Sequence, residues 1–147
     1  MTDVIDVRIK RLSAGASLPS RMTASAAGFD LAAAGPTPVV LAPGDIVVIP
    51  CGFAMALPEG YEAQVRPRSG LSSRHGVTVV NAPGTVDSDY RGEVCVPLIN
   101  LGRQPFTVEP GMRVAQMVIA PVPPVRLVEV TELDDTPRGT GGFGHTG

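Results

Sequence analysis

Several residue types that carry common chemistry are scarce in this chain of 147 residues. It has no tryptophan, 4% aromatic residues, two cysteines, two histidines and a single lysine, Lys10. The cysteines, Cys51 and Cys95, and the histidines, His75 and His145, are too scattered to show the spacing of a zinc site. We therefore expect two buried free thiols within apolar runs, no disulfide, and no transition metal held by protein ligands.

Long apolar runs and long basic runs are also missing. No stretch approaches the roughly 18 apolar residues that cross a bilayer. The first six residues, MTDVID, lack the basic start and apolar run of a secretory signal. The net charge of -2 argues against a broad basic surface for nucleic acid. We therefore expect a cytoplasmic protein with neither a membrane nor a nucleic acid as partner.

The chain is rich in residues that make turns, with 15 prolines and 17 glycines, and its length suits one domain. Turn signals at 43–44, 58–60, 83–84 and 110–111 separate short apolar runs. The runs predict strands near 7–12 and over 45–50, 52–57, 93–100, 113–119 and 126–130. Pro50 and Pro97 lie inside such runs and indicate edges or bulges. This pattern predicts an all-β fold, a jelly roll or barrel-like sandwich.

One segment differs from the strands around it. Residues 69–75 are typical of a short helix, opened by a serine, Ser69, and closed by a glycine, Gly76. The segment starts within RPRSGL (66–71), where Arg68 supplies a charged fork, Ser69 a hydroxyl and Gly70 an accessible backbone amide. Such groups suit phosphate oxygens, although for this tripeptide taken alone an ordinary turn with a solvated arginine is the better explanation. The chain has no P-loop motif.

A second segment, NAPGTVDSDYRGEV (81–94), gathers polar groups around a turn. Flanks at 77–81 and from 93 onward predict a hairpin whose backbone could bind a flat polar ring. Asn81 offers both a donor and an acceptor. Asp87 is our candidate general base, with Asp89 as its local competitor. Turn residues alone would also account for this composition.

Two further polar residues stand in apolar surroundings. Gln116 lies in the run 114–119 and must find a hydrogen-bond partner, either in the backbone or in a ligand. Asp30 follows Phe29 in AGFDL (27–31) and could order a site or form a structural salt bridge. The last ten residues, RGTGGFGHTG (138–147), contain five glycines and are expected to be mobile until something binds.

Five segments, in this order, resemble motifs of the trimeric dUTP pyrophosphatase (dUTPase) family. They are AGFDL (27–31), RPRSGL (66–71), NAPGTVDSDYRGEV (81–94), GMRVAQ (111–116) and RGTGGFGHTG (138–147). They extend over nearly the whole chain. The resemblance implies a homotrimer with sites shared between chains, a β-domain over 1–137, and a flexible lid over 138–147.

The resemblance also implies roles for individual residues. Asp87 would activate the attacking water, and Tyr90 would pack under the deoxyribose. Asp30 would order the site or hold metal-bound water. The substrate would be bound by Arg68, Ser69, Gly70 and Gln116 at the phosphates, by Asn81, Thr85, Val86 and Cys95 around uracil, and by the lid residues Arg138, Phe143, Gly144, His145 and Thr146.

The implied reaction is hydrolysis of dUTP to dUMP and diphosphate, which keeps uracil out of DNA and supplies dUMP for dTMP synthesis. Mg²⁺ would be the cofactor, held by the substrate phosphates and water without a direct protein ligand. Two alternatives stay open at this point. One is a dCTP deaminase-like or bifunctional enzyme of the same fold, and the other is a non-catalytic nucleotide-binding trimer.

Overall fold

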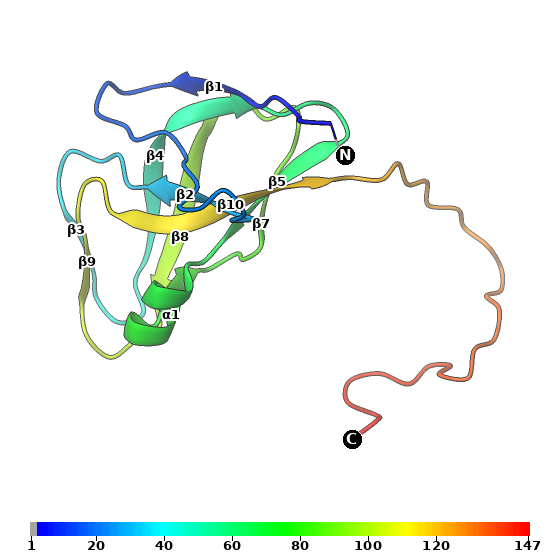
Figure 1. Cartoon of the computed structure of the whole chain (residues 1–147). Coiled ribbons are helices and arrows are strands. Elements are labelled where there is room, and N and C mark those ends of the chain that lie inside the picture. Colours follow the sequence, from blue (N-terminus) through cyan, green and yellow to red (C-terminus); the bar gives the residue numbers. More distant parts are fainter. Residues whose placement is uncertain (1–2) are drawn as a thin grey trace.

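A computed structural model describes residues 3–147 and has two packed layers of β-strands (Figure 1). The strands and the single helix follow this order along the chain: β1 (Arg8–Arg11), β2 (Phe29–Ala32), β3 (Val39–Leu41), β4 (Ile46–Ala56), β5 (Tyr61–Arg66), α1 (Ser69–His75), β6 (Val77–Val79), β7 (Gly84–Val86), β8 (Glu93–Asn100), β9 (Phe106–Val108) and β10 (Arg113–Pro121). The all-β prediction with one short helix is confirmed.

The strands form two four-stranded sheets and one small pair. One sheet has the order β1-β4-β8-β6, the other β2-β10-β5-β7, and β3 pairs with β9. All these pairings are antiparallel. The core lies between the layers because both sheets contribute to one buried cluster, including Phe53 on β4, Leu98 on β8, Leu31 on β2 and Val65 on β5. The architecture is therefore an open β-sandwich.

Strand β8 shows how the sequence sets the two faces of a sheet. Val94, Val96 and Leu98 are buried, while the residues between them are half-buried. The side-chain period of two therefore places Cys95 on the face away from the core. Cys51 is buried as expected, but Cys95 is only partly buried, and both thiols are free.

The two prolines in apolar runs behave differently. The register of β4 against β8 shifts between Pro50 and Ala54, so the bulge expected at Pro50 is present. The expectation for Pro97 is wrong, because it pairs with Val48 in regular register inside the central strand β8. Its carbonyl accepts a hydrogen bond from Val80, just beyond the end of β6. The side of Pro97 that lacks an N–H therefore faces Val80, where the polypeptide has left β6.

Helix α1 follows the predicted range. Gly76 ends it in the left-handed conformation with φ 68°, and its N–H donates to the carbonyl of Ser72. Ser69 is the first helical residue, as the predicted range has it, but Arg68 rather than a serine is the N-cap, and it forms no side-chain cap bond. None of the described helices is long and apolar enough to cross a membrane.

The end of the chain leaves the sandwich after β10. Residues 122–147 have no helix or strand and extend away from the two sheets (Figure 1). The strand predicted over 126–130 is therefore wrong: Leu127 is 93% exposed, and no other strand of the described chain pairs with this segment. An apolar alternation does not make a strand unless its backbone groups find a partner.

Candidate active site

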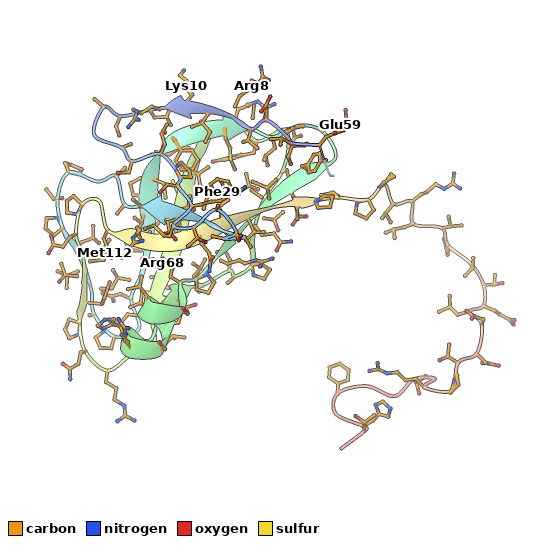
Figure 2. The ribbon with its side chains drawn as sticks, in the orientation of Figure 1. Arg8, Lys10, Phe29, Glu59, Arg68 and Met112 are labelled. Carbon is orange, nitrogen blue, oxygen red and sulfur yellow. The ribbon has the colours of Figure 1, made fainter. Side chains whose placement is uncertain are left out.

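Strands β2, β10 and β5 bring several of the predicted phosphate-binding residues together. Gln116 on β10 lies opposite Asp30 on β2 and opposite Arg66 on β5. The chain then turns from β5 into α1 through Pro67 and Arg68. Figure 2 shows Arg68 at the side of the sandwich where α1 begins. We call Asp30, Arg68, Arg113 and Gln116 the arginine cluster.

Asp30 holds both arginines of this cluster. Its Oδ1 lies 3.5 Å from Nε of Arg68, and its Oδ2 lies 3.2 Å from a terminal nitrogen of Arg113. Arg68 also donates to the backbone carbonyl of Arg113 at 3.3 Å. The Asp30 side chain is 13% exposed and that of Arg68 30%, so the guanidinium remains open to solvent on one side. The salt bridge considered for Asp30 is present, and it also orders Arg68.

Gln116 has its hydrogen-bond partner in the backbone. Its side-chain amide donates to the carbonyl of Pro67 at 3.0 Å, which ties β10 to the segment carrying Arg68. Gly28 makes room for this arrangement, because a Cβ at Gly28 would lie 2.3 Å from Oε1 of Gln116. Asp30 and Gln116, the two polar residues of these apolar strands, thus both belong to the arginine cluster. Ser69 is exposed and Gly70 half-buried at the start of α1 beside it.

The second group of predicted residues lines a pocket between β7 and the start of β8. The pocket has a volume of about 240 Å³ and is lined by Thr85, Val86, Asp87, Tyr90, Glu93, Val94 and Cys95. Strands β6 and β8 pair as the predicted hairpin, but β7 between them crosses to the other sheet and pairs with β5. We call this the hairpin pocket.

The hairpin pocket separates the two candidate bases. Asp87 lines it, whereas Asp89 lies on an adjoining surface with Leu57, Glu59 and Arg91, a surface that Asp87 also borders. The Asp87 carboxylate makes no hydrogen bond or ion pair with a residue of the described range, so it is open to a ligand or water. This placement favours Asp87 over Asp89 as the residue next to a bound ring.

Tyr90 is held at the mouth of the pocket. Its hydroxyl donates to the backbone carbonyl of Glu93 at 2.8 Å, and its side chain is 45% exposed. Asn81 is not among the lining residues; it is exposed in the turn after β6, with its amide nitrogen close to Gly84. Of the predicted uracil contacts, the structure therefore brings Thr85, Val86 and Cys95 together in the pocket but not Asn81, and Phe143 lies on the exposed tail.

The lid residues lie apart from both groups. Arg138 donates to the carbonyl of Gly141 at 2.9 Å, and Phe143 is fully exposed with φ 50°. Gly144, His145 and Thr146 are exposed as well. Within this single chain the structure does not bring the lid residues to the arginine cluster or to the hairpin pocket (Figure 1).

The two thiols near the pocket are held in their protonated forms. Burial, followed by the neighbouring Cys95 and Glu93, raises the pKa of Cys51 to about 12. Burial and then Glu93 also raise the pKa of Cys95. Because the thiolate is the nucleophilic form, neither cysteine is prepared for nucleophilic catalysis.

Three residues of the site were missed in the sequence. Gly28 and Arg113 lie inside segments that resemble family motifs, 27–31 and 111–116. The available signal for Gly28 was a residue without a side chain close to the polar Asp30. Glu93 begins an apolar strand, and a charged residue there was the signal that it has a specific partner. No group of three or more His, Cys, Asp or Glu side chains in residues 3–147 is arranged to hold a metal ion.

Comparison with known proteins gives a consistent answer. A sequence model of the dUTPase family matches residues 14–147. Relatives named deoxyuridine 5'-triphosphate nucleotidohydrolase occur in Desulfotalea psychrophila and Caulobacter vibrioides. The first is 63% identical over 131 residues, covering 89% of this chain and 87% of the relative. The second is 59% identical over 145 residues, covering 96% and 94%.

Solved structures with the same fold include two phage dUTPases. The enzyme of Staphylococcus bacteriophage 80alpha, solved with dUPNHPP, has a TM-score of 0.85 and 29% identity, covering 97% of this chain and 98% of that one. A variant from phage phi11 of S. aureus, described with a structural Mg(II) ion, has a TM-score of 0.78 and 26% identity, covering 86% and 97%.

Proposed function

Because this chain belongs to the dUTPase family, we propose that it hydrolyses dUTP to dUMP and diphosphate. The observation that carries the mechanism is the hairpin pocket, where Asp87 and Tyr90 stand beside Thr85, Val86 and Cys95. In a cell this activity keeps uracil out of DNA and supplies dUMP for dTMP synthesis. We also propose that the enzyme acts in the cytoplasm.

The pocket suits a flat ring with alternating donors and acceptors. Thr85 and Val86 on β7 and Cys95 on β8 all line the pocket, and uracil requires an acceptor, a donor and an acceptor to be satisfied. Cytosine presents a different pattern and leaves buried polar groups unpaired. We assign base recognition to the backbone groups of these three residues, with Asn81 reaching the ring from the preceding turn.

Asp87 acts as the general base in this proposal. Its free carboxylate takes the proton of a water that attacks the α-phosphorus in line with the leaving diphosphate. A positioned base of this kind contributes about 10²–10⁴ in rate. Tyr90 packs under the deoxyribose and leaves no space for a 2′-hydroxyl. Sugar choice and water activation thus come from the same short segment.

The arginine cluster binds the phosphates. Arg68 is prearranged by Asp30 and still has an open side, so its fork can receive phosphate oxygens without first being ordered. Ser69 and Gly70 add a hydroxyl and a backbone amide, and Gln116 adds an amide next to them. Together these groups offset the charge that develops on the leaving diphosphate.

Mg²⁺ fits the residues present as an ion held mainly by substrate. Mg²⁺ keeps several waters and is commonly bound through phosphates rather than by an all-protein cage. Asp30 is the carboxylate of the arginine cluster and can accept hydrogen bonds from metal-bound water. When bound, the ion offsets the negative charge of the triphosphate.

The lid completes the site from another chain of a homotrimer. Arg138 contacts the γ-phosphate, Phe143 stacks on uracil, and Gly144, His145 and Thr146 close over the phosphates. The support is the extended placement of residues 122–147, which leaves them free to reach a neighbouring copy. Closure excludes water from the reacting bond. The boundary at 137/138 between β-domain and lid is part of this proposal.

Two experiments test the proposal. Diphosphate release is measured side by side with dUTP, dCTP, dTTP and UTP, and turnover of dUTP alone is expected. A uracil product from dCTP would establish a deaminase, and tight dUTP binding without turnover would establish a non-catalytic binder. For the shared site, a chain ending at Pro137 is mixed with full-length Asp87→Asn. Recovered activity supports sites built from different chains, and no recovery despite proven subunit exchange contradicts them.

A further inference from the structure

Glu93, the first residue of β8, accepts hydrogen bonds through both its side chain and its backbone. Its carboxylate Oε2 accepts from the backbone N–H of Gly52 on β4 at 2.9 Å. Its backbone carbonyl accepts from the Tyr90 hydroxyl at 2.8 Å. It also lines the hairpin pocket. One residue therefore connects the edge of the pocket to the central sheet of the sandwich.

The Gly52 end of this connection is fixed. Gly52 lies at the bulge where the register of β4 against β8 shifts, and its φ of 75° is in the left-handed region. A Cβ at Gly52 would lie 2.5 Å from the Ala16 side chain and 2.7 Å from that of Ala34. A bulge leaves backbone groups out of the ladder, and the Glu93 carboxylate satisfies the Gly52 N–H.

The Tyr90 end is equally specific. A Cβ at Gly92 would lie 2.4 Å from the Tyr90 hydroxyl oxygen, so the ring occupies space that only glycine leaves free. The hydroxyl then reaches the carbonyl of the next residue, Glu93. The direction of the Tyr90 ring is thus set by where the Glu93 backbone lies, and the Glu93 side chain anchors that backbone on Gly52.

The anchor works as a hydrogen-bond acceptor rather than as half of an ion pair. The salt bridges of the described chain both involve Asp30, and none reaches Glu93. The negative charge of Glu93 contributes to the raised pKa values of Cys51 on β4 and Cys95 on β8. A glutamine at this position keeps an oxygen acceptor of nearly the same shape.

We infer that Glu93 is a positioning residue for sugar selection, anchoring the start of β8 on the Gly52 bulge so that its carbonyl holds Tyr90 against the ribose side of the pocket. This inference rests on the proposed function for its substrate. It assigns to Glu93 an effect on the choice between dUTP and UTP, which a residue serving only the fold would not have.

The experiment compares Glu93→Ala and Glu93→Gln in the full chain. We measure the ratio of kcat/KM for dUTP to that for UTP, together with Tm. Loss of one anchoring hydrogen bond should lower this ratio about tenfold in Glu93→Ala. In Glu93→Gln the ratio should stay within about twofold of the parent, because the acceptor remains.

Asp45→Ala is the matched control. The Asp45 carboxylate also accepts from a backbone N–H at 2.9 Å, that of Ala42, in a turn that does not line the pocket. Asp45→Ala should lower Tm about as much as Glu93→Ala does, while leaving the ratio of kcat/KM for dUTP and UTP unchanged. A Glu93→Ala protein that loses Tm but keeps the parent ratio, like the control, would overturn the inference. So would a Glu93→Gln protein that discriminates as poorly as Glu93→Ala.

A second measurement does not depend on turnover. The chain has two tyrosines, Tyr61 and Tyr90, so 3-fluorotyrosine gives two ¹⁹F signals, which Tyr61→Phe assigns. The Tyr90 signal should move in Glu93→Ala and stay in place in Glu93→Gln. An unmoved Tyr90 signal in Glu93→Ala would contradict the positioning role. A parent protein that fails to prefer dUTP, with the Tyr90 signal still moving, would contradict the proposed function and the link to sugar choice, while leaving the positioning of Tyr90 by Glu93 intact.

Discussion

The sandwich and the tail hold their proposed substrate-binding residues in opposite ways. In the sandwich two of the phosphate-binding residues are held by residues distant in sequence: Arg68 by Asp30, and Gln116 by Pro67. In the tail the hydrogen bonds are local, such as that of Arg138 with Gly141. Groups that are already fixed act without an ordering cost, whereas a glycine-rich segment loses backbone entropy when it closes. Sandwich variants should therefore affect stability and activity together, and tail variants activity alone.

The largest effect is expected for Asp87→Asn, an exception within the sandwich. Because the Asp87 carboxylate has no partner in the described chain, its loss should leave Tm nearly unchanged. Turnover should fall by about 10²–10⁴ while dUTP binding largely survives, since the amide cannot take a proton. Diphosphate release and calorimetric binding measure the two quantities. Asp89→Asn is the control, and near-normal turnover in Asp87→Asn would transfer the role to Asp89.

Removing the tail after Pro137 comes next. The lost residues are exposed except for the half-buried Gly141 and Gly142 and make only local hydrogen bonds, so Tm should change by no more than about 2 °C. Turnover should fall by about 10²-fold, as for loss of an electrostatic clamp that acts in the closed state. Thermal melts and diphosphate release provide the test. A large fall in Tm would show that the tail belongs to the folded unit, and unchanged turnover would remove its role as a lid.

Gly28→Ala should affect both properties moderately. The new Cβ displaces the Gln116 side chain and its bond to Pro67, which costs about 0.5–1.5 kcal/mol of unfolding free energy. KM for dUTP should rise about tenfold if Gln116 contacts phosphate. Gly15→Ala is the control, because a Cβ there meets nothing within 4 Å.

A double-mutant cycle with Gln116→Ala sharpens this result. If Gly28→Ala acts by displacing Gln116, the two changes should be strongly non-additive in both Tm and KM. Additive effects would mean that Gly28 and Gln116 act independently. The measurements are chemical unfolding and steady-state kinetics on the two single variants and the double variant.

The smallest effect near neutral pH concerns the buried thiol, whose contribution changes only at alkaline pH. The pKa of Cys51 is raised from 9.0 to about 12, so the folded protein keeps a proton that the unfolded chain releases above pH 9. Its contribution to stability is complete below pH 9 and is lost as pH rises toward 12, at no more than about 1.4 kcal/mol per pH unit. Cys51→Ala should therefore lose stability less steeply than the parent in this range. Identical slopes in urea unfolding would contradict the shift.

Much of the local structure follows from the sequence because its causes are local. The apolar alternation over 93–100 is the buried and half-buried alternation of β8, and Gly76 ends α1 where predicted. The same reasoning failed for 126–130, because alternation reports what a strand needs but not whether a partner strand exists in the chain. Asn81 was predicted to contact uracil only because it lies in the segment 81–94. The fold leaves it in a turn, and it does not line the hairpin pocket.

The chemical groups of the proposed site can be listed from the chain alone: a carboxylate, a tyrosine, an arginine and a serine at the start of a short helix, and a glycine-rich end. Which of these groups meet depends on the fold. The register of β10 sets Gln116 opposite Asp30, and the bulge at Gly52 gives Glu93 its partner. Propensities and turns act over a few residues, whereas register depends on burying whole faces of distant strands against each other. The pairs that hold the site therefore had to be read from the fold.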